Sequence, residues 1–123
     1  MGALTIAAAL LVAPVLAQTM SITTRPTNVT LKVGQSAYIY VESRGSWPGL
    51  NGTTCGAFPH SKPGDTVAVS NVHQMKMGES GAMSLDVKGQ HPGTCFLRFA
   101  MTAETKDGDV KELKATTHIT VTP

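Results

Sequence analysis

The chain has 123 residues, a net charge of +2 from ten basic and eight acidic side chains, and few aromatic residues: three Phe, two Tyr and one Trp. The basic residues are scattered from Arg25 to Lys114 without a cluster, and the aromatic residues are too few for stacking platforms, which together argue against a nucleic-acid-binding protein. The length suits one domain with one hydrophobic core and is too short for two.

The N-terminus is predicted to be a cleavable export signal, residues 1–17. Residues 4–12 are apolar, Pro14 ends any helix, and Ala17 supplies a small side chain before Gln18. The apolar stretch is too short to span a bilayer. We therefore expect a domain of residues 18–123, secreted or periplasmic and without a membrane anchor after cleavage. The alternative is a hydrophobic first strand or a retained anchor.

The rest of the chain shows period-two alternation of apolar and polar residues between turn signals, and no helical stripe. This pattern predicts strands, which in chain order cover residues 29–33, 37–41, 66–70, 73–77, 83–87, 94–102 and 110–121. Gly34, the segment 78–81 and the segment 106–109 are turn signals. Strands with one apolar face each are best satisfied by two sheets packed face to face, so we predict an all-β, two-sheet antiparallel sandwich.

One long segment, residues 43–65, is rich in Gly and Pro and is predicted to be irregular apart from a short strand at 54–57. It is the only loop roomy enough to hold a site. Trp47, Leu50 and Phe58 are apolar residues in this loop. They predict a contact surface for a protein or a surface polymer. The alternative is that the loop folds over the end of the sandwich and buries Trp47 as a lid.

The two cysteines, Cys55 and Cys95, are predicted to pair, because a disulfide persists in an exported protein. Closing a loop of about forty residues, as this pair would, stabilises a fold by about 4 kcal/mol. The alternative is two buried thiols. A metal site is not predicted at the cysteines, since neither has a second Cys or a His at ligand spacing.

His73, Met75 and Met77 occupy alternate positions of one predicted strand. An imidazole and two thioethers on one face are ligands suited to Cu(I), which would make the protein a periplasmic copper-binding protein. The same alternation is typical of an inward-facing core strand, in which Met fills irregular space. Both interpretations fit the sequence.

Motifs for catalysis are missing from the sequence. Phosphate-binding Gly-rich loops, Gly-x-Ser-x-Gly elbows and His-Glu-x-x-His helices are absent, and the carboxylates are mostly single. We predict a protein that is not an enzyme and has no cofactor. Asn28 and Asn51 fit the N-glycosylation pattern, which matters only in a eukaryotic secretory pathway.

Three short motifs occur in a consistent order. They are the opening Val29-Thr30-Leu31-Lys32-Val33-Gly34, the central Thr66-Val67-Ala68-Val69, and Pro92-Gly93-Thr94 leading into Cys95-Phe96-Leu97. In this order the chain resembles the bacterial Ig-like domains of invasin- and intimin-type adhesins. The resemblance implies an Ig-like sandwich that binds a partner or serves as a spacer. It also implies that Cys55 and Cys95 lie on neighbouring strands or across the core from each other.

A second Ig-like family, the chagasin-like inhibitors of papain-type proteases, is also similar in outline. Asn51-Gly52-Thr53-Thr54 resembles one inhibitory loop, with Gly in place of Pro, and Gly78 to Gly81 faintly resembles another; the Arg-Pro-Trp-like segment is absent. This resemblance implies a cysteine-protease inhibitor as an alternative function.

Overall fold

The computed structural model describes residues 20–56 and 60–123, and within them the chain is all-β. The predicted signal, residues 1–17, lies outside the described residues. Eight strands follow one another: β1 (Ser21–Arg25), β2 (Asn28–Lys32), β3 (Ser36–Arg44), β4 (Gly49–Thr53), β5 (Val67–Met77), β6 (Ser80–Gly89), β7 (Gly93–Glu104) and β8 (Val110–Thr122).

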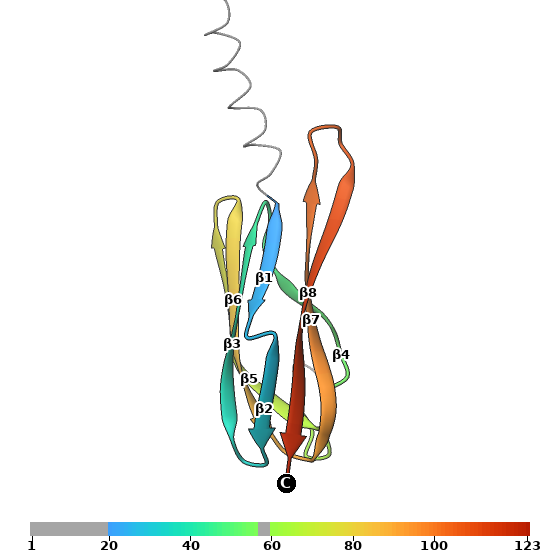
Figure 1. The fold of residues 1–123 in the computed structure, drawn as a ribbon. Coiled ribbons are helices and arrows are strands. Elements are labelled where there is room, and N and C mark those ends of the chain that lie inside the picture. Colours follow the sequence, from blue (N-terminus) through green and yellow to red (C-terminus); the bar gives the residue numbers. More distant parts are fainter. Residues whose placement is uncertain (1–19, 57–59) are drawn as a thin grey trace, which may run out of the picture.

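The strands form two four-stranded sheets, with the orders β1-β3-β6-β5 and β2-β8-β7-β4. Figure 1 shows the two sheets lying face to face along the length of the molecule. All strand pairs are antiparallel except β2 with β8, which is parallel. If β1 and β2 are counted as two halves of one first strand, the order is that of an Ig domain. The predicted Ig-like sandwich is therefore the observed fold.

The core lies between the sheets and is made by alternate residues of the central strands. In β3, Ile39 and Val41 are buried, whereas Tyr38 on the opposite face is exposed. The same alternation in β6, β7 and β8 brings apolar side chains from both sheets into one cluster, because successive strand residues point to opposite faces. The cluster includes Val29, Leu31, Ile39, Val41, Val67, Met83, Leu85, Val87, Leu97, Phe99, Ile119 and Val121.

The disulfide between Cys55 and Cys95 is present, as predicted. Cys95 lies in β7, and Cys55 follows β4, the strand beside it in the same sheet. Ig domains instead commonly join their two sheets with a disulfide. Here the link between sheets at this point is made by the carbonyl of Cys55, which accepts hydrogen bonds from the backbone N–H groups of Thr66 and Val67 at the start of β5.

The prediction for residues 43–65 was partly wrong. Instead of a short strand at 54–57, the strand is β4 at Gly49–Thr53, while Thr54 and Cys55 form a bend and residue 57 lies outside the described residues. β4 contains two glycines, which disfavour strands locally. It forms because β7 lies alongside and pairs with it, from Gly49 opposite Ala100 to Thr53 opposite Leu97. β1 was not predicted either, and it forms by pairing with β3.

β5 departs from its predicted alternation at one point. Val67 is buried, but the pairing with β6 shifts between Ser70 and His73, where Asn71 has a φ of 52°. This is a β-bulge, which inserts an extra residue and reverses the faces of all that follow. As a result Met75 and Met77 are exposed, by 45% and 55%, and the interpretation of them as core residues is wrong.

The strands β7 and β8 form a hairpin that extends past the other strands at one end of the molecule (Figure 1). Its turn is the predicted one at residues 106–109, closed by a hydrogen bond from Thr105 N–H to the Asp109 carbonyl. β4 ends opposite Ala100, and β2 pairs with β8 only from His118 onwards. We call the part beyond these points, residues 101–104 and 110–113, the ribbon. Within its own sheet the ribbon has no neighbouring strand among the described residues.

Candidate binding site

Trp47 lies at the end of the molecule from which the ribbon extends, between β3 and β4. Its indole N–H donates a hydrogen bond of 3.2 Å to the carbonyl of Gly78, in the turn between β5 and β6. The ring also covers Gly81 of β6, where a Cβ atom would lie only 2.8 Å from Trp47 Cδ1. The absence of a side chain at Gly81 therefore makes room for the indole, and the next residue, Pro48, is buried.

The outer side of the indole is open. Lys76 Nζ lies 4.6 Å from the centre of the Trp47 ring, and 41% of the Trp47 surface is exposed. A cation above an exposed ring contributes about 0.5–1 kcal/mol, enough to favour one orientation of the indole. Trp47 is thus fixed on one side by β6 and open to solvent on the other. Trp47 is therefore not buried as a lid, and a contact surface at its exposed side stays a prediction.

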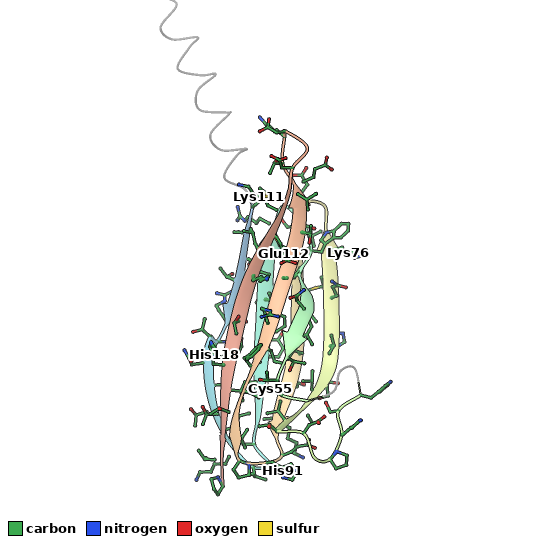
Figure 2. The ribbon with its side chains drawn as sticks, turned by 90° about the vertical axis from the view of Figure 1, so that its right-hand side faces the viewer. Cys55, Lys76, His91, Lys111, Glu112 and His118 are labelled. Carbon is green, nitrogen blue, oxygen red and sulfur yellow. A yellow bond between two sulfur atoms is a disulfide. The ribbon has the colours of Figure 1, made fainter. Side chains whose placement is uncertain are left out.

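An open hollow of about 370 Å³ lies next to Trp47. The loop and β4 line it with Trp47, Pro48 and Leu50, β5 with Gln74, and the β7–β8 hairpin with Ala100, Met101, Thr102 and Glu112. The Gln74 side-chain amide donates a 2.6 Å hydrogen bond to the Pro48 carbonyl, which joins the edges of the two sheets there. Figure 2 shows Lys76 and Glu112 toward this end of the molecule and His91 at the opposite end.

The backbone of β7 is unpaired along one side of this hollow. In an antiparallel strand, successive residues direct their N–H and C=O groups to opposite sides. Thr105 bonds toward β8, whereas the Phe96 carbonyl accepts from Thr54 N–H on the β4 side. The backbone N–H and C=O groups of the even-numbered residues of β7 therefore point away from β8. Thr102 and Glu104 lie past the end of β4, so within the described chain their backbone groups face no strand.

The charges around the hollow are mixed. Glu112 forms an exposed ion pair with Lys114, with 3.2 Å between the carboxylate oxygen and Nζ. Lys76 is held over the indole, and Glu104 is exposed on the ribbon. Exposed pairs of this kind contribute little to stability. The site therefore offers an apolar anchor and a backbone edge in a polar surround, without a dominant charge.

The other predicted contact residues have different positions. Leu50 is half-buried in β4, packs against the core and also lines the hollow, so only part of it is available to a partner. Phe58 lies outside the described residues. Asn51 to Thr53 belong to β4 instead of a loop, which removes the basis for comparing them with an inhibitory loop. Asn28 and Asn51, the residues of the N-glycosylation patterns, are both exposed.

The histidine and methionines of β5 lie elsewhere, on the outer face of the sheet that contains β6. His73 is opposite Ser84, Met75 opposite Ala82 and Met77 opposite Ser80. In the parts of the chain that the structure describes, no group of three or more His, Cys, Asp or Glu could hold a metal ion.

The sequence did not indicate two features of the site, Gln74 and the unpaired edge at Thr102 and Glu104. The alternation that puts His73, Met75 and Met77 on the core face of a strand puts Gln74 on the opposite face, and the bulge turns Gln74 toward the other sheet. The unpaired edge depends on where β4 ends, and β4 itself was not placed correctly. The only signal in the sequence was the length of the apolar alternation at 94–102, which exceeds that of a typical strand.

None of the described residues forms a helix long and apolar enough to cross a membrane. No protein-family model matches the chain, and no curated protein matches it. Among solved structures, the chain is similar to the BIgI domain of beta protein from S. agalactiae bound to CEACAM1. The identity is 15%, the match covers 85% of this chain and 99% of that one, and the TM-score is 0.45. A similarity at this level carries nothing about the partner of this chain.

Proposed function

We propose that this protein is an exported, non-enzymatic Ig-like binding module that holds a partner protein at the end formed by Trp47 and the ribbon. The observation that carries the proposal is the position of Trp47, anchored at Gly78 and Gly81 yet 41% exposed, next to the hollow and the unpaired edge of β7. An aromatic side chain held rigidly at the surface loses little conformational entropy on binding and is a typical interface hot spot.

The unpaired edge favours a protein over a surface polymer as the partner. Thr102 and Glu104 offer backbone donors and acceptors in strand geometry, which an extended peptide can pair with and a polysaccharide cannot match in register. In this mode the partner's segment would continue the line of β4 alongside β7. One of its apolar side chains would then enter the hollow beside Trp47.

Photo-crosslinking tests the proposal. A photoreactive phenylalanine analogue is placed at Glu104 on the ribbon, and at Tyr38 as a control on the outer face of the other sheet, where Tyr38 is 58% exposed. In the protein's own host, a discrete crosslinked species is expected from position 104 and not from position 38. Excess unlabelled protein should suppress it, whereas the Trp47→Ala variant should not. Equal crosslinking from both positions, or equal competition by both proteins, would overturn the proposal.

The free edge can be tested without a partner. Thr102→Pro removes an N–H group that points away from β8, so the domain should keep its urea midpoint. Ala103→Pro removes an N–H group that pairs with β8 and should lower the midpoint clearly. The reverse order of the two variants would show that Thr102 is not on the open side. If Thr102→Pro folds normally, it should also lose the crosslink from position 104.

Export rests on the apolar residues 1–17 and on the disulfide, which suits an oxidising compartment. The measurement is the intact mass of the protein recovered from its host, before and after reduction and alkylation. A chain that begins at Gln18, and whose thiols react only after reduction, is expected. A chain that keeps residues 1–17, or that carries two reactive thiols, would contradict export.

A further inference from the structure

The bulge in β5 turns one imidazole and two thioether side chains toward solvent. Beyond Asn71, the residues of β5 lie opposite Ser84, Ala82 and Ser80 of β6. Met83 and Leu85 of β6 face the core, so Ala82 and Ser84 face outward, and so do the residues paired with them. His73, Met75 and Met77 therefore form a row on the outer face of the sheet. The β6 side chains opposite them are small, and Ala82 and Ser84 are themselves buried, with 0% and 7% of their surface exposed.

Two exposed methionines side by side need an explanation. Methionine is ordinarily among the buried residues, and Met83 and Met101 follow that rule with 4% and 2% exposure. Met75 and Met77 are exposed by about half and contribute little to the core. Asn71 has a positive φ, a conformation that Asn adopts more readily than most residues with a side chain, and the bulge there is what moves the two thioethers to the surface.

The donor atoms determine which ion such a row can bind. Thioether sulfur and imidazole nitrogen are ligands for Cu(I), whereas carboxylates and carbonyls suit Mg²⁺ and Ca²⁺. Ag(I) shares the charge and softness of Cu(I). Both cysteines of the chain are held in the disulfide, so no thiolate competes for a soft ion. The two thioethers therefore match soft monovalent ions better than hard divalent ones.

The spacing limits how many of these side chains can share one ion. Alternate residues of a strand are about 6.7 Å apart, so an ion midway between two neighbours is within reach of both side chains. His73 and Met77 are separated by about 13 Å by the same rise and cannot bind the same ion. Met75 is central, and one neighbour completes a two-coordinate site.

We propose that Met75, together with His73 or Met77, binds Cu(I) on the outer face of β5. This site is separate from the hollow beside Trp47 and does not depend on the proposed partner. It would let the module carry or buffer Cu(I) outside the cytosol. The ion is bound and released without a change in its oxidation state.

The test is a titration of the full-length purified protein with Ag(I) in chloride-free buffer, followed by NMR of methionines labelled with ¹³C at the terminal methyl group. Ag(I) needs no reductant, so the disulfide stays intact during the experiment. The methyl signals of Met75 and Met77 are expected to shift and saturate. The signals of the buried Met83 and Met101 should stay in place, as internal controls. Zn(II) should shift none of them.

Variants identify the ligands. Met75→Leu, which conserves volume at an exposed position, should abolish saturable binding. Of His73→Ala and Met77→Leu, the variant that removes the main partner of Met75 should weaken binding severalfold, and the other should change it little. Met101→Leu is the matched control and should bind as the original protein does. Anaerobic Cu(I) titration with ascorbate should reproduce the order of the variants. An unmoved Met75 signal, or equal affinity of Met75→Leu and Met101→Leu, would overturn the proposal.

Discussion

Removal of the disulfide is the perturbation whose effect follows most directly from the structure. The Cys55–Cys95 bond closes a loop with a sequence separation of 40 residues. In the chain-entropy description, this closure destabilises the unfolded chain by about 4 kcal/mol relative to the open chain. Both sulfurs also lie in the core, with Cys55 2% and Cys95 6% exposed, so their loss removes packing as well. The variant with Cys55→Ala and Cys95→Ala should therefore be less stable by about 4 kcal/mol or slightly more.

The assay is equilibrium unfolding in urea followed by the fluorescence of Trp47, the single tryptophan. With a slope of about 1.5 kcal/mol per M, the midpoint should fall by about 2 to 3 M. The slope should also rise, because the open unfolded chain exposes more surface than the crosslinked one. If the free energy of unfolding of the original protein is below about 4 kcal/mol, the double variant would be unfolded even without urea.

Reduction of the original protein separates the two contributions. Reduced protein loses the crosslink but keeps both sulfur atoms, so it should be almost as unstable as the double variant, and the remaining difference measures the lost packing. A midpoint change below about 0.5 M on reduction would refute the loop-closure argument. It would mean that the unfolded chain is already restrained, or that the bond strains the native fold.

Two further substitutions test contacts between separate parts of the chain. Gly81→Ala places a Cβ atom against Trp47, so indole emission should shift toward that of solvent-exposed tryptophan and stability should fall by about 1–3 kcal/mol, while Gly64→Ala, with nothing within 4 Å, should change neither. Thr117→Val removes a fully buried hydroxyl that donates to the Pro26 carbonyl at 2.9 Å, and urea unfolding should show a loss of about 1–3 kcal/mol. Thr120→Val, on the exposed face of the same strand, should stay within about 0.5 kcal/mol.

Much of the fold could be predicted from local patterns. The segments around Ile39, Leu85 and Phe99 alternate apolar and polar residues because each strand buries one face, and the structure buries these three side chains completely. The two-sheet arrangement followed from each of these strands having a single apolar face to bury. The disulfide followed from the cysteine count together with the export signal, which itself stays a prediction.

β4 and the bulge in β5 could not be predicted this way. Gly49 to Thr53 has no strand pattern, and it is extended only because β7 supplies hydrogen-bond partners from another part of the chain. At Asn71 a single positive φ reverses the faces of Met75 and Met77. Alternation in the sequence shows that successive residues lie on opposite faces of a strand, but it does not show which face is buried. One inserted residue therefore leaves the alternation of Met75 and Met77 unchanged while it moves their side chains from the core to solvent.

The sequence alone determined that this chain is an all-β sandwich with paired cysteines, and that Trp47 stands out among its few aromatic residues. Only the tertiary structure decided what surrounds Trp47. Its anchor at Gly78 and Gly81, the hollow beside it and the unpaired edge at Thr102 come from segments far apart in the chain. The physical reason is that an unpaired edge exists where one strand extends beyond the end of its neighbour. The lengths of neighbouring strands are set by pairing between residues that are distant in the sequence.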